Sequence, residues 1–463
     1  MERETSLEVI VLAAGAGTRM RSRLPKMLHR VGGRPLLGHV LDAAGVLQPA
    51  ALRVVVGEGA EAVRAAFSSR TDVHWTLQSE RKGSGHAAIQ ALPDVADDAT
   101  VLVLAGDVPL VRAEVLERCV AGAVSGLALV TAHVGQPAGL GRIERSADGR
   151  VTGIVEERDA TPEQKAIREI NTGILAAPAA LLIKLLGEVG ADNAQGEHYL
   201  TDVVGLAAHR GISIRAVEGG TTEALGVNDR RQLAQAERQW QRTQAERLMA
   251  GGTTIADPAR LDIRGRLTAG QDCFIDINVV FEGEVTLGDD VVVEAGCVIR
   301  DATVGDGAHI KPHSVIDGAV IGRRSEIGPF ARLRPGTELG EAVRIGNFVE
   351  TKKARLGDGV KASHLAYLGD AAIGKDSNVG AGTVTCNYDG VDKHETEVGE
   401  GAFIGTNSTL VAPLTIEDQA YIAAGSTVTT RVPKEGLAVG RARQRNISGW
   451  SPPAKRKARK KPA

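Results

Sequence analysis

The chain has 463 residues and a formal net charge of −2, and this length predicts two or three domains. A charge balance so close to zero gives no reason to expect nucleic acid or a membrane surface as a partner. The four cysteines, Cys119, Cys273, Cys297 and Cys386, lack the spacing of paired ligands and predict reduced thiols, which argues against a disulfide framework and a zinc site.

The N-terminus carries a few charged residues and then an apolar run that leads straight into a glycine-rich turn. It has no long apolar segment and no cleavage pattern, so we expect a cytoplasmic protein.

Apolar runs alternate with helical patterns in the N-terminal half. Strands are predicted at residues 7–14, 51–56, 101–104 and 127–131, and helices at residues 35–44 and 60–66. This alternation predicts a mostly parallel sheet that is covered on both faces, with ligands at the carboxyl ends of its strands.

A glycine-rich turn at residues 15–20 directly follows the first predicted strand. Backbone N–H groups in such a turn can approach a phosphate, and Arg19 and Lys26 supply positive charge beside it. The segment lacks both the Gly-Lys-Ser/Thr of a P-loop and the third glycine of the dinucleotide fingerprint. Taken alone, it is also compatible with a tight turn between a strand and a helix.

Asp107 follows the strand predicted at residues 101–104. A carboxylate at the tip of a central parallel strand, beside a phosphate loop, is where a divalent cation would neutralise a triphosphate. The alternative is that Asp107 only caps the turn before a helix near residues 112–119.

Residues 229–249 lack glycine and proline, and apolar residues recur at helical spacing within them. We expect a helix that ends at Gly251 and Gly252 and joins two domains.

An aliphatic residue returns every six positions between about residues 285 and 428. The three sets are Leu287, Val293 and Ile299; Ile321, Ile327, Leu333, Leu339 and Ile345; and Val398, Ile404, Leu410, Ile416, Ile422 and Val428. This period fits a solenoid whose short strands each send one side chain inward before the chain turns. Glycine-rich loops of a β-sandwich would not keep this register for so long. The array resembles the hexapeptide-repeat family, which implies a left-handed parallel β-helix, an acyltransferase and a trimer.

Polar residues interrupt the repeats in one section, around Arg334, Lys352 and His364. Acetyl transfer to an amine needs a base for the ammonium proton, donors for the oxyanion and cations for an acceptor phosphate. Histidine suits the first task. Each residue alone could equally belong to a solvated face or a corner hydrogen bond.

Ordered motifs resemble the sugar-nucleotide pyrophosphorylases. They comprise residues 12–20, 24–26, 77–78, 83–87, 106–107, 139–143, 153–156, 169–173 and 226–228. With a β-helix behind them, nearly the whole chain is similar to the bacterial family of bifunctional N-acetylglucosamine-1-phosphate uridylyltransferase/glucosamine-1-phosphate acetyltransferases. The resemblance implies an α/β, Rossmann-like uridylyltransferase domain at residues 1–227, a helical linker at 228–250, an acetyltransferase β-helix at 251–440 and a C-terminal segment at 441–463.

The resemblance also implies site residues in the first domain. The uridine part of UTP is assigned to Leu12, Ala13, Ala14, Gly15, Gln78, Gly83 and Ser84, the phosphates to Lys26 and Arg19, Mg²⁺ to Asp107 and Asn228, and N-acetylglucosamine to Gly141, Glu156 and Asn171. The sugar 1-phosphate is itself the nucleophile, so no protein nucleophile is needed. Ser84 replaces a threonine and keeps its hydroxyl, whereas Ala105 replaces a frequent tyrosine and leaves one nucleotide contact open.

In the β-helix, the resemblance makes His364 the general base. It assigns the acceptor sugar phosphate to Arg334, Lys352, Tyr367, Asn378 and Lys393, and acetyl-CoA to Ala381, Asn387, Tyr388, Thr406, Ala424 and Arg441. Thr406 replaces the usual serine. The family forms homotrimers with this site between subunits, and its product, UDP-N-acetylglucosamine, supplies peptidoglycan and lipopolysaccharide synthesis.

Two other functions are compatible with parts of the sequence. One keeps only the nucleotidyltransferase and makes the β-helix an oligomerisation or regulatory module, against which His364 and Lys393 argue. The other is a scaffold with inert sites, against which Asp107 and Asn228 argue. The basic run at residues 455–461 is expected to be a solvated tail, with a nucleic-acid contact as the alternative.

Overall fold

The computed structural model describes residues 6–450, so the basic run at 455–461 lies outside the described residues. The chain divides into two compact units: Met1–Arg247 with Leu261–Gly265, and Leu248–Arg260 with Arg266–Ala463. Each is described by itself below. Within residues 6–450, no helix has the length and apolar character needed to cross a membrane.

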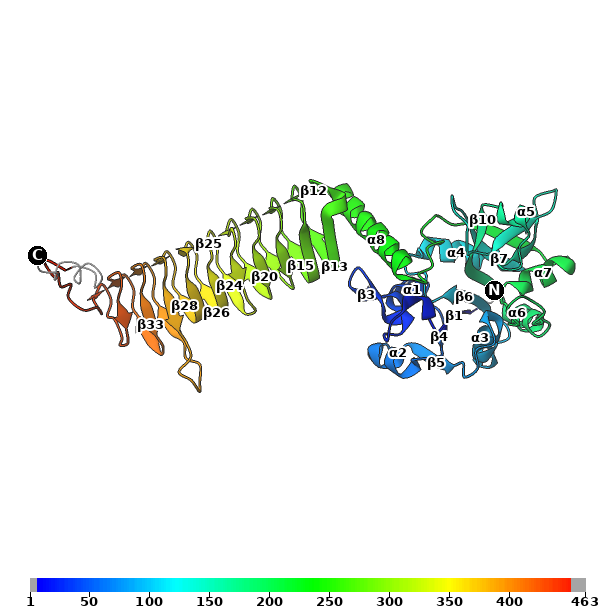
Figure 1. Ribbon diagram of the computed structural model, residues 1–463, viewed down its shortest axis with the longest axis horizontal. Helices are drawn as coiled ribbons and strands as arrows, with labels where there is room; N and C mark the ends of the chain where they lie inside the picture. The colour runs from blue at the N-terminus through cyan, green and yellow to red at the C-terminus, as the bar shows by residue number, and fades with distance from the viewer. Residues whose placement is uncertain (1–5, 451–463) are drawn as a thin grey trace, which may run out of the picture. The chain divides into compact units, whose positions relative to one another are not determined.

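The first unit contains a mixed sheet with helices on both faces (Figure 1). Its strands are β1 (Leu7–Ala13), β2 (Arg30–Val31), β3 (Arg34–Pro35), β4 (Ala51–Val56), β5 (Val73–Leu77), β6 (Thr100–Ala105), β7 (Leu127–His133), β8 (Arg142–Arg145), β9 (Val151–Val155), β10 (Glu169–Pro178) and β11 (Ile214–Glu218). Its helices are η1 (Thr18–Met20), η2 (Lys26–Leu28), α1 (Leu36–Val46), α2 (Ala60–Ala66), α3 (Ser84–Ala91), η3 (Leu92–Asp94), α4 (Ala113–Gly122), α5 (Pro162–Lys165), α6 (Ala179–Leu186) and α7 (Asp202–His209). Helix α8 (Arg230–Ala250) leads into the second unit and ends before Gly251, as predicted.

The main sheet has the strand order β11-β7-β10-β6-β1-β4-β5. All neighbours are parallel except β10, which runs antiparallel to β6 and β7. The prediction of a mostly parallel sheet is therefore confirmed, and the four predicted strands agree with β1, β4, β6 and β7 to within two residues at each end.

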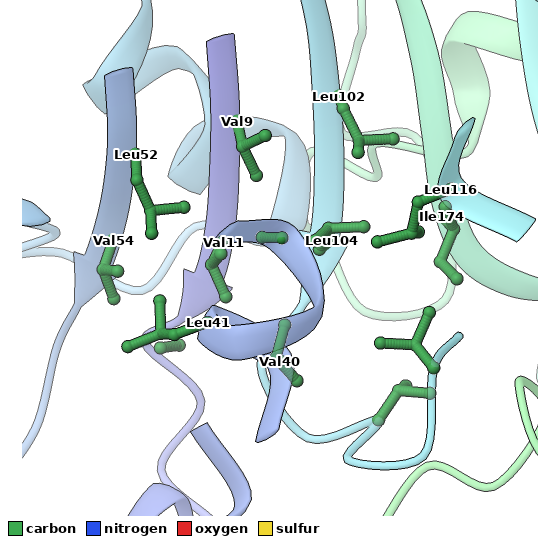
Figure 2. Packing of buried hydrophobic residues seen from close by; sticks show 14 of the residues in the cluster. Val9, Val11, Val40, Leu41, Leu52, Val54, Leu102, Leu104, Leu116 and Ile174 are labelled. Carbon is green, nitrogen blue, oxygen red and sulfur yellow. The ribbon is translucent and has the colours of Figure 1, made fainter. Parts of the chain in front are cut away.

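Two apolar cores cover the faces of this sheet. On one face, Val40 and Leu41 of α1 pack over Val11 and Leu104 (Figure 2). On the other face, helices α3, α6 and α7 cover Ile10 and Val103. Burial on both faces explains why β1 and β6 are nearly continuous apolar runs. Each fully buried aliphatic side chain contributes about 1.5–3 kcal/mol.

The second unit is a parallel β-helix in which strands form three ladders along stacked coils (Figure 1). The first ladder contains β12 (Thr254–Ile255), β14 (Phe274–Ile275), β16 (Val292–Val293), β19 (His309–Ile310), β22 (Glu326–Ile327), β25 (Arg344–Asn347), β27 (Lys361–His364), β29 (Asn378–Val379), β32 (Phe403–Ile404), β35 (Tyr421–Ile422) and β37 (Leu437–Ala438).

The second ladder contains β15 (Val279–Leu287), β17 (Val298–Arg300), β20 (Val315–Asp317), β23 (Arg332–Leu333), β26 (Glu350–Leu356), β28 (Tyr367–Ile373), β30 (Val384–Cys386), β33 (Thr409–Val411) and β36 (Thr427–Val428). The third uses the later parts of β15, β26 and β28 with β18 (Thr303–Val304), β21 (Ala319–Ile321), β24 (Thr337–Leu339), β31 (Thr396–Val398) and β34 (Leu414–Ile416). Turn η4 (Pro258–Arg260) lies near the start of the second unit, and strand β13 (Leu261–Ala269) is divided between the units, with Leu261–Gly265 counted in the first.

The six-residue period corresponds to the inward side chains of these coils. Every member of the three predicted sets is at most 6% exposed. The close stacking explains the glycines that follow them: a Cβ on Gly322 would lie 2.2 Å from the carbonyl oxygen of Gly340 in the next coil. The stacked coils extend to earlier residues than the six-residue array that begins near residue 285, because Ile255 and Ile275 already pair in the first strands.

All four cysteines are free thiols. Burial raises the pKa of Cys119 to about 12 and that of Cys297 to about 11. These two side chains behave as small apolar core residues.

Candidate active sites

A cavity of about 450 Å³ lies at the carboxyl ends of the parallel strands in the first unit. It is lined by Leu12, Ala14, Gly15, Ala16, Gly17, Thr18, Arg19, Lys26, Gln78, Arg81, Gly83, Ser84, Ala87, Gln195, Glu197 and Asn228. The loop after β1, the residue after β5 and the start of α3 thus meet at one edge of the sheet. Ala13 does not line the cavity and is 6% exposed.

Lys26 joins the two predicted metal ligands. Its ammonium contacts Asp107 and donates a hydrogen bond to Asn228 Oδ1 at 2.8 Å. The backbone N–H of Val227 donates to the carbonyl of Asp107 at 2.9 Å, which ties the segment of Asn228 to the end of β6. Gly17 has φ +61°, and a Cβ there would lie 2.6 Å from Cβ of Lys26. The absence of a side chain at Gly17 therefore lets Lys26 pack directly against the glycine-rich turn.

The same contacts show that the Asp107 and Asn228 oxygens lie close together, because both face one ammonium group. Such a pair suits Mg²⁺, which prefers oxygen ligands and completes its shell with water and substrate phosphates. Among residues 6–450, no group of three or more His, Cys, Asp or Glu side chains could hold a metal ion.

Gln78 and Ser84 are fixed by backbone partners. The side-chain amide of Gln78, 5% exposed, donates to the carbonyl of Gly83 at 3.2 Å. The hydroxyl of Ser84 accepts the N–H of Leu200 at 3.0 Å, so its own proton remains available to a ligand.

Gly141, Glu156 and Asn171 also come together. The N–H of Asn171 donates to the carbonyl of Gly141 at 2.9 Å, and a Cβ on Gly141 would lie 3.3 Å from Oε1 of Glu156. Thr201 donates to Glu156 at 3.1 Å, while burial raises the pKa of that carboxyl group. Hydrogen-bond acceptors thus lie beside Gly141, which has no side chain to block a ligand from the backbone. Such a surface suits a sugar.

Sequence reasoning missed several groups at this edge. Arg81, Gln195 and Glu197 line the cavity, yet Gln195 and Glu197 lie in a loop that no sequence motif marks. Arg142, 1% exposed, holds the loop at Gly141 by donating to the carbonyl of Leu140 and to Glu157.

In the second unit, a column of residues follows one corner of the coils. Asn347, His364, Ala381, Thr406 and Ala424 each lie two residues after an inward residue of the first ladder, namely Ile345, Ala362, Val379, Ile404 and Ile422, which pair in register. We call these five residues the corner column. Coils stack about 4.8 Å apart, so the column gives a line of evenly spaced groups. Arg441 lies beside its end, near Gly425.

His364 is exposed, and its Nδ1 contacts Oδ1 of Asn347 at 2.9 Å. If Nδ1 carries the proton, this contact orients the ring and leaves Nε2 free to accept a proton. Asn347 was not predicted. Asn347 lies opposite His364 in the preceding coil, and only the strand pairing in the structure reveals that the two residues are neighbours.

Three cations form a second cluster. The neighbouring ammonium of Lys393 lowers the pKa of Lys352, and Arg334 adds to the effect. Arg334 also donates to Glu350 at 2.9 Å. Lys393 comes from an insertion that leaves the stacked coils between β30 and β31 and appears in orange in Figure 1. Two ammonium groups held together in this way suit a phosphate.

The other predicted residues lie around these groups. Asn387, 8% exposed, donates to Asp370, whereas Tyr388 is exposed and donates to the carbonyl of Gly390. The Tyr367 hydroxyl lies over Gly369, where a Cβ would be 2.4 Å away. Asn378 begins β29 and pairs with Lys361.

Comparison with known proteins covers both units. A MobA-like NTP transferase domain matches residues 9–204, a GMPPB C-terminal domain matches 263–356, and a hexapeptide repeat of succinyl-transferase matches 396–430. The hexapeptide match and the parallel ladders identify the second unit as a left-handed parallel β-helix.

Relatives named bifunctional protein GlmU match this chain over nearly its whole length. Those of Marinobacter nauticus and Alkalilimnicola ehrlichii are each 54% identical, over 97% and 98% of this chain and 99% and 98% of their own lengths. That of Stenotrophomonas maltophilia is 52% identical over 97% of this chain and 99% of its own. With a nucleotidyltransferase unit and a hexapeptide-repeat unit matched from end to end, the chain belongs to the family of the bifunctional protein GlmU.

Proposed function

We propose that this chain makes UDP-N-acetylglucosamine in two steps: acetyl transfer from acetyl-CoA to glucosamine 1-phosphate, then Mg²⁺-dependent uridylyl transfer from UTP to N-acetylglucosamine 1-phosphate. The observation that supports this proposal is a candidate site in each unit of a chain that matches its GlmU relatives over nearly their whole length. We assign the first activity to residues 251–440, the second to residues 1–227 and the connection to 228–250.

Uridylyl transfer is a displacement at phosphorus. A phosphate oxygen of the sugar 1-phosphate forms a bond to the α-phosphorus of UTP, while the bond to the β-phosphate breaks and pyrophosphate leaves with its electron pair. Lys26 and Arg19 lie where the phosphates would enter, and Gln78 and Ser84 border the same cavity on the side assigned to uridine. Fixed cations and correct positioning supply the catalysis, so no protein nucleophile is required.

Asp107 and Asn228 would hold Mg²⁺, which would neutralise charge on the phosphates when bound. Lys26 holds these two oxygens in the structure. We propose that Lys26 turns from Asp107 to the phosphates when the nucleotide binds, which would leave the carboxylate of Asp107 available to hold Mg²⁺.

Acetyl transfer joins the amine of glucosamine 1-phosphate to the acetyl carbon and releases the thiol of coenzyme A. We propose that Nε2 of His364 accepts the ammonium proton, with Asn347 holding the ring. Lys352, Lys393 and Arg334 would bind the acceptor phosphate, and Ala381, Thr406 and Ala424 would line the path of acetyl-CoA. The extended coenzyme can run along such a column.

We propose a cytoplasmic location, because four free thiols suit a reducing compartment. The product would then serve as a precursor for peptidoglycan and lipopolysaccharide.

Replacing Asp107 by Asn should lower the rate of uridylyl transfer by about a hundredfold or more, because the cation on the phosphates loses its charged ligand. Acetylation should stay within about twofold of wild type, since its residues lie in the other unit. Both rates are measured on one preparation, with Asp98→Asn, an exposed acid of the same unit, as the matched control. Equal loss of both activities in a folded variant would contradict the assignment.

Replacing His364 by Ala should lower acetylation by about 10²-fold or more, the contribution typical of a positioned base. Uridylyl transfer should be retained. The control is His309→Ala, a histidine of the same ladder in an earlier coil. Acetylation near the wild-type rate in the His364 variant would exclude His364 as the base.

The site in the β-helix is expected to be completed by a second subunit of a homotrimer. The side chain of His364 is exposed to solvent in the single chain. The neighbouring side chains of Phe330, Phe348 and Leu365 are 48%, 57% and 62% exposed. Sedimentation should give a species about three times the chain mass of 48.4 kDa. A monomer with full acetyltransferase activity would overturn the shared site.

A further inference from the structure

We call the cavity of about 450 Å³ described above, which is assigned to UTP, the nucleotide cavity. A second cavity, of about 600 Å³, adjoins it in the first unit. It is lined by Thr18, Arg19, Met20, Arg21, Asp229, Arg230 and Arg231, and we call it the arginine cavity. Thr18 and Arg19 line both cavities. The two spaces are therefore separated by a single turn of the glycine loop, η1, which is the segment assigned to the phosphates.

The charge of the arginine cavity is strongly positive. Four of its seven lining residues are arginines, and Asp229 is the sole acid among them. The carboxylate of Asp229 already accepts the N–H groups of Arg231 and Gln232, each at 2.9 Å, at the start of α8. These hydrogen bonds, first that from Gln232, lower the pKa of Asp229. One carboxylate that is engaged by backbone donors cannot balance four guanidinium groups.

The arginines fall into two kinds. Arg230 is structural: its Nε donates to the carbonyl of Met20 at 3.2 Å, and its guanidinium contacts Nδ1 of His29 at 3.3 Å. Burial, and then the charge of Arg230, lower the pKa of His29, so this ring stays neutral and donates no further charge. Among residues 6–450, no salt bridge joins Arg19, Arg21 or Arg231 to a carboxylate, although the charges of Arg231 and Arg19 help to lower the pKa of Asp229. Their guanidinium groups can therefore bind an anion.

The turn between the cavities has an unusual backbone. Gly17, before η1, has φ +61°, and Arg21, directly after it, has φ +48°. The left-handed region is unfavourable for a residue with a side chain. Here it keeps Arg21 in the wall of the arginine cavity while Arg19 remains at the boundary with the nucleotide cavity.

We propose that the arginine cavity binds pyrophosphate, the leaving group of uridylyl transfer, as it departs from the nucleotide cavity past Arg19. This inference rests on the proposed uridylyl transfer and assigns a residence site to its second product. Pyrophosphate carries several negative charges and presents oxygens on two phosphorus atoms, which guanidinium groups bind in pairs. The cavity has no exposed apolar platform for a base, because Met20 is 1% exposed, so a bare polyphosphate fits it better than a nucleoside.

The test uses the full chain in the reverse direction, in which pyrophosphate and UDP-N-acetylglucosamine give UTP and the sugar 1-phosphate. The double variant Arg21→Gln/Arg231→Gln should raise the KM for pyrophosphate about five- to twentyfold, as expected for two partly exposed charge contacts. The KM for UDP-N-acetylglucosamine should change less than about twofold. The KM for pyrophosphate should also rise less steeply with salt in the variant than in wild type, because fewer charges attract the anion.

The control variant Arg64→Gln/Lys184→Gln removes two exposed charges from α2 and α6 and should leave both KM values unchanged. Calorimetry with pyrophosphate alone supplies a second measurement, in which the Arg21/Arg231 variant should bind more weakly than wild type. An unchanged KM and unchanged binding in that variant, with an active wild type, would overturn the arginine cavity as a pyrophosphate site. A wild type that catalyses no reverse reaction would instead overturn the proposed uridylyl transfer.

Discussion

Parallel strand pairing in register is the interaction on which both candidate sites depend. In the first unit it brings the carboxyl ends of β1, β5 and β6 to one edge: the N–H of Gly106 donates to Leu12, and that of Gln78 to Val56. In the second unit it repeats one corner position from coil to coil, so that Asn347, His364, Ala381, Thr406 and Ala424 align. A shift of one residue in the strand pairing of either unit would turn these side chains to the other face of the sheet.

Each candidate site also contains lysine side chains whose positive charge could bind a phosphate. In the first unit, the ammonium of Lys26 contacts both Asp107 and Asn228, the two residues proposed to hold the metal ion. In the second unit, the neighbouring ammonium of Lys393 lowers the pKa of Lys352. An acceptor phosphate would offset these positive charges on binding. Both candidate sites thus contain positive charge before any ligand is bound, which is the arrangement that electrostatic catalysis requires.

Much of this architecture could be predicted from the sequence, because its periods are long and regular. The apolar runs that became β1 and β4 and the uninterrupted pattern that became α8 had clear ends, and the six-residue spacing matched the buried side chains. The six-residue spacing does not extend to the first coils, because Ile255 and Ile275 are separated by irregular spacing; a β-helix from residue 251 was implied only by the family resemblance. The antiparallel β10 was also missed, since its pairing partners lie far away in the chain.

Within the sites, residues that belong to motifs could be predicted, whereas those brought in by tertiary pairing could not. Gln195 and Glu197 reach the nucleotide cavity from a loop without a pattern. Asn347 matters only because β25 and β27 pair residue for residue. The ammonium contact between Lys26 and Asp107 joins positions that are 81 residues apart. No local spacing could have revealed it.

The most direct measurement is thiol release from acetyl-CoA by the purified chain, with and without glucosamine 1-phosphate. The account predicts release that depends on the sugar phosphate, because the proposed function assigns acetyl transfer to the β-helix. No release from a correctly folded assembly would contradict it and would leave the β-helix as a structural support for a single uridylyltransferase.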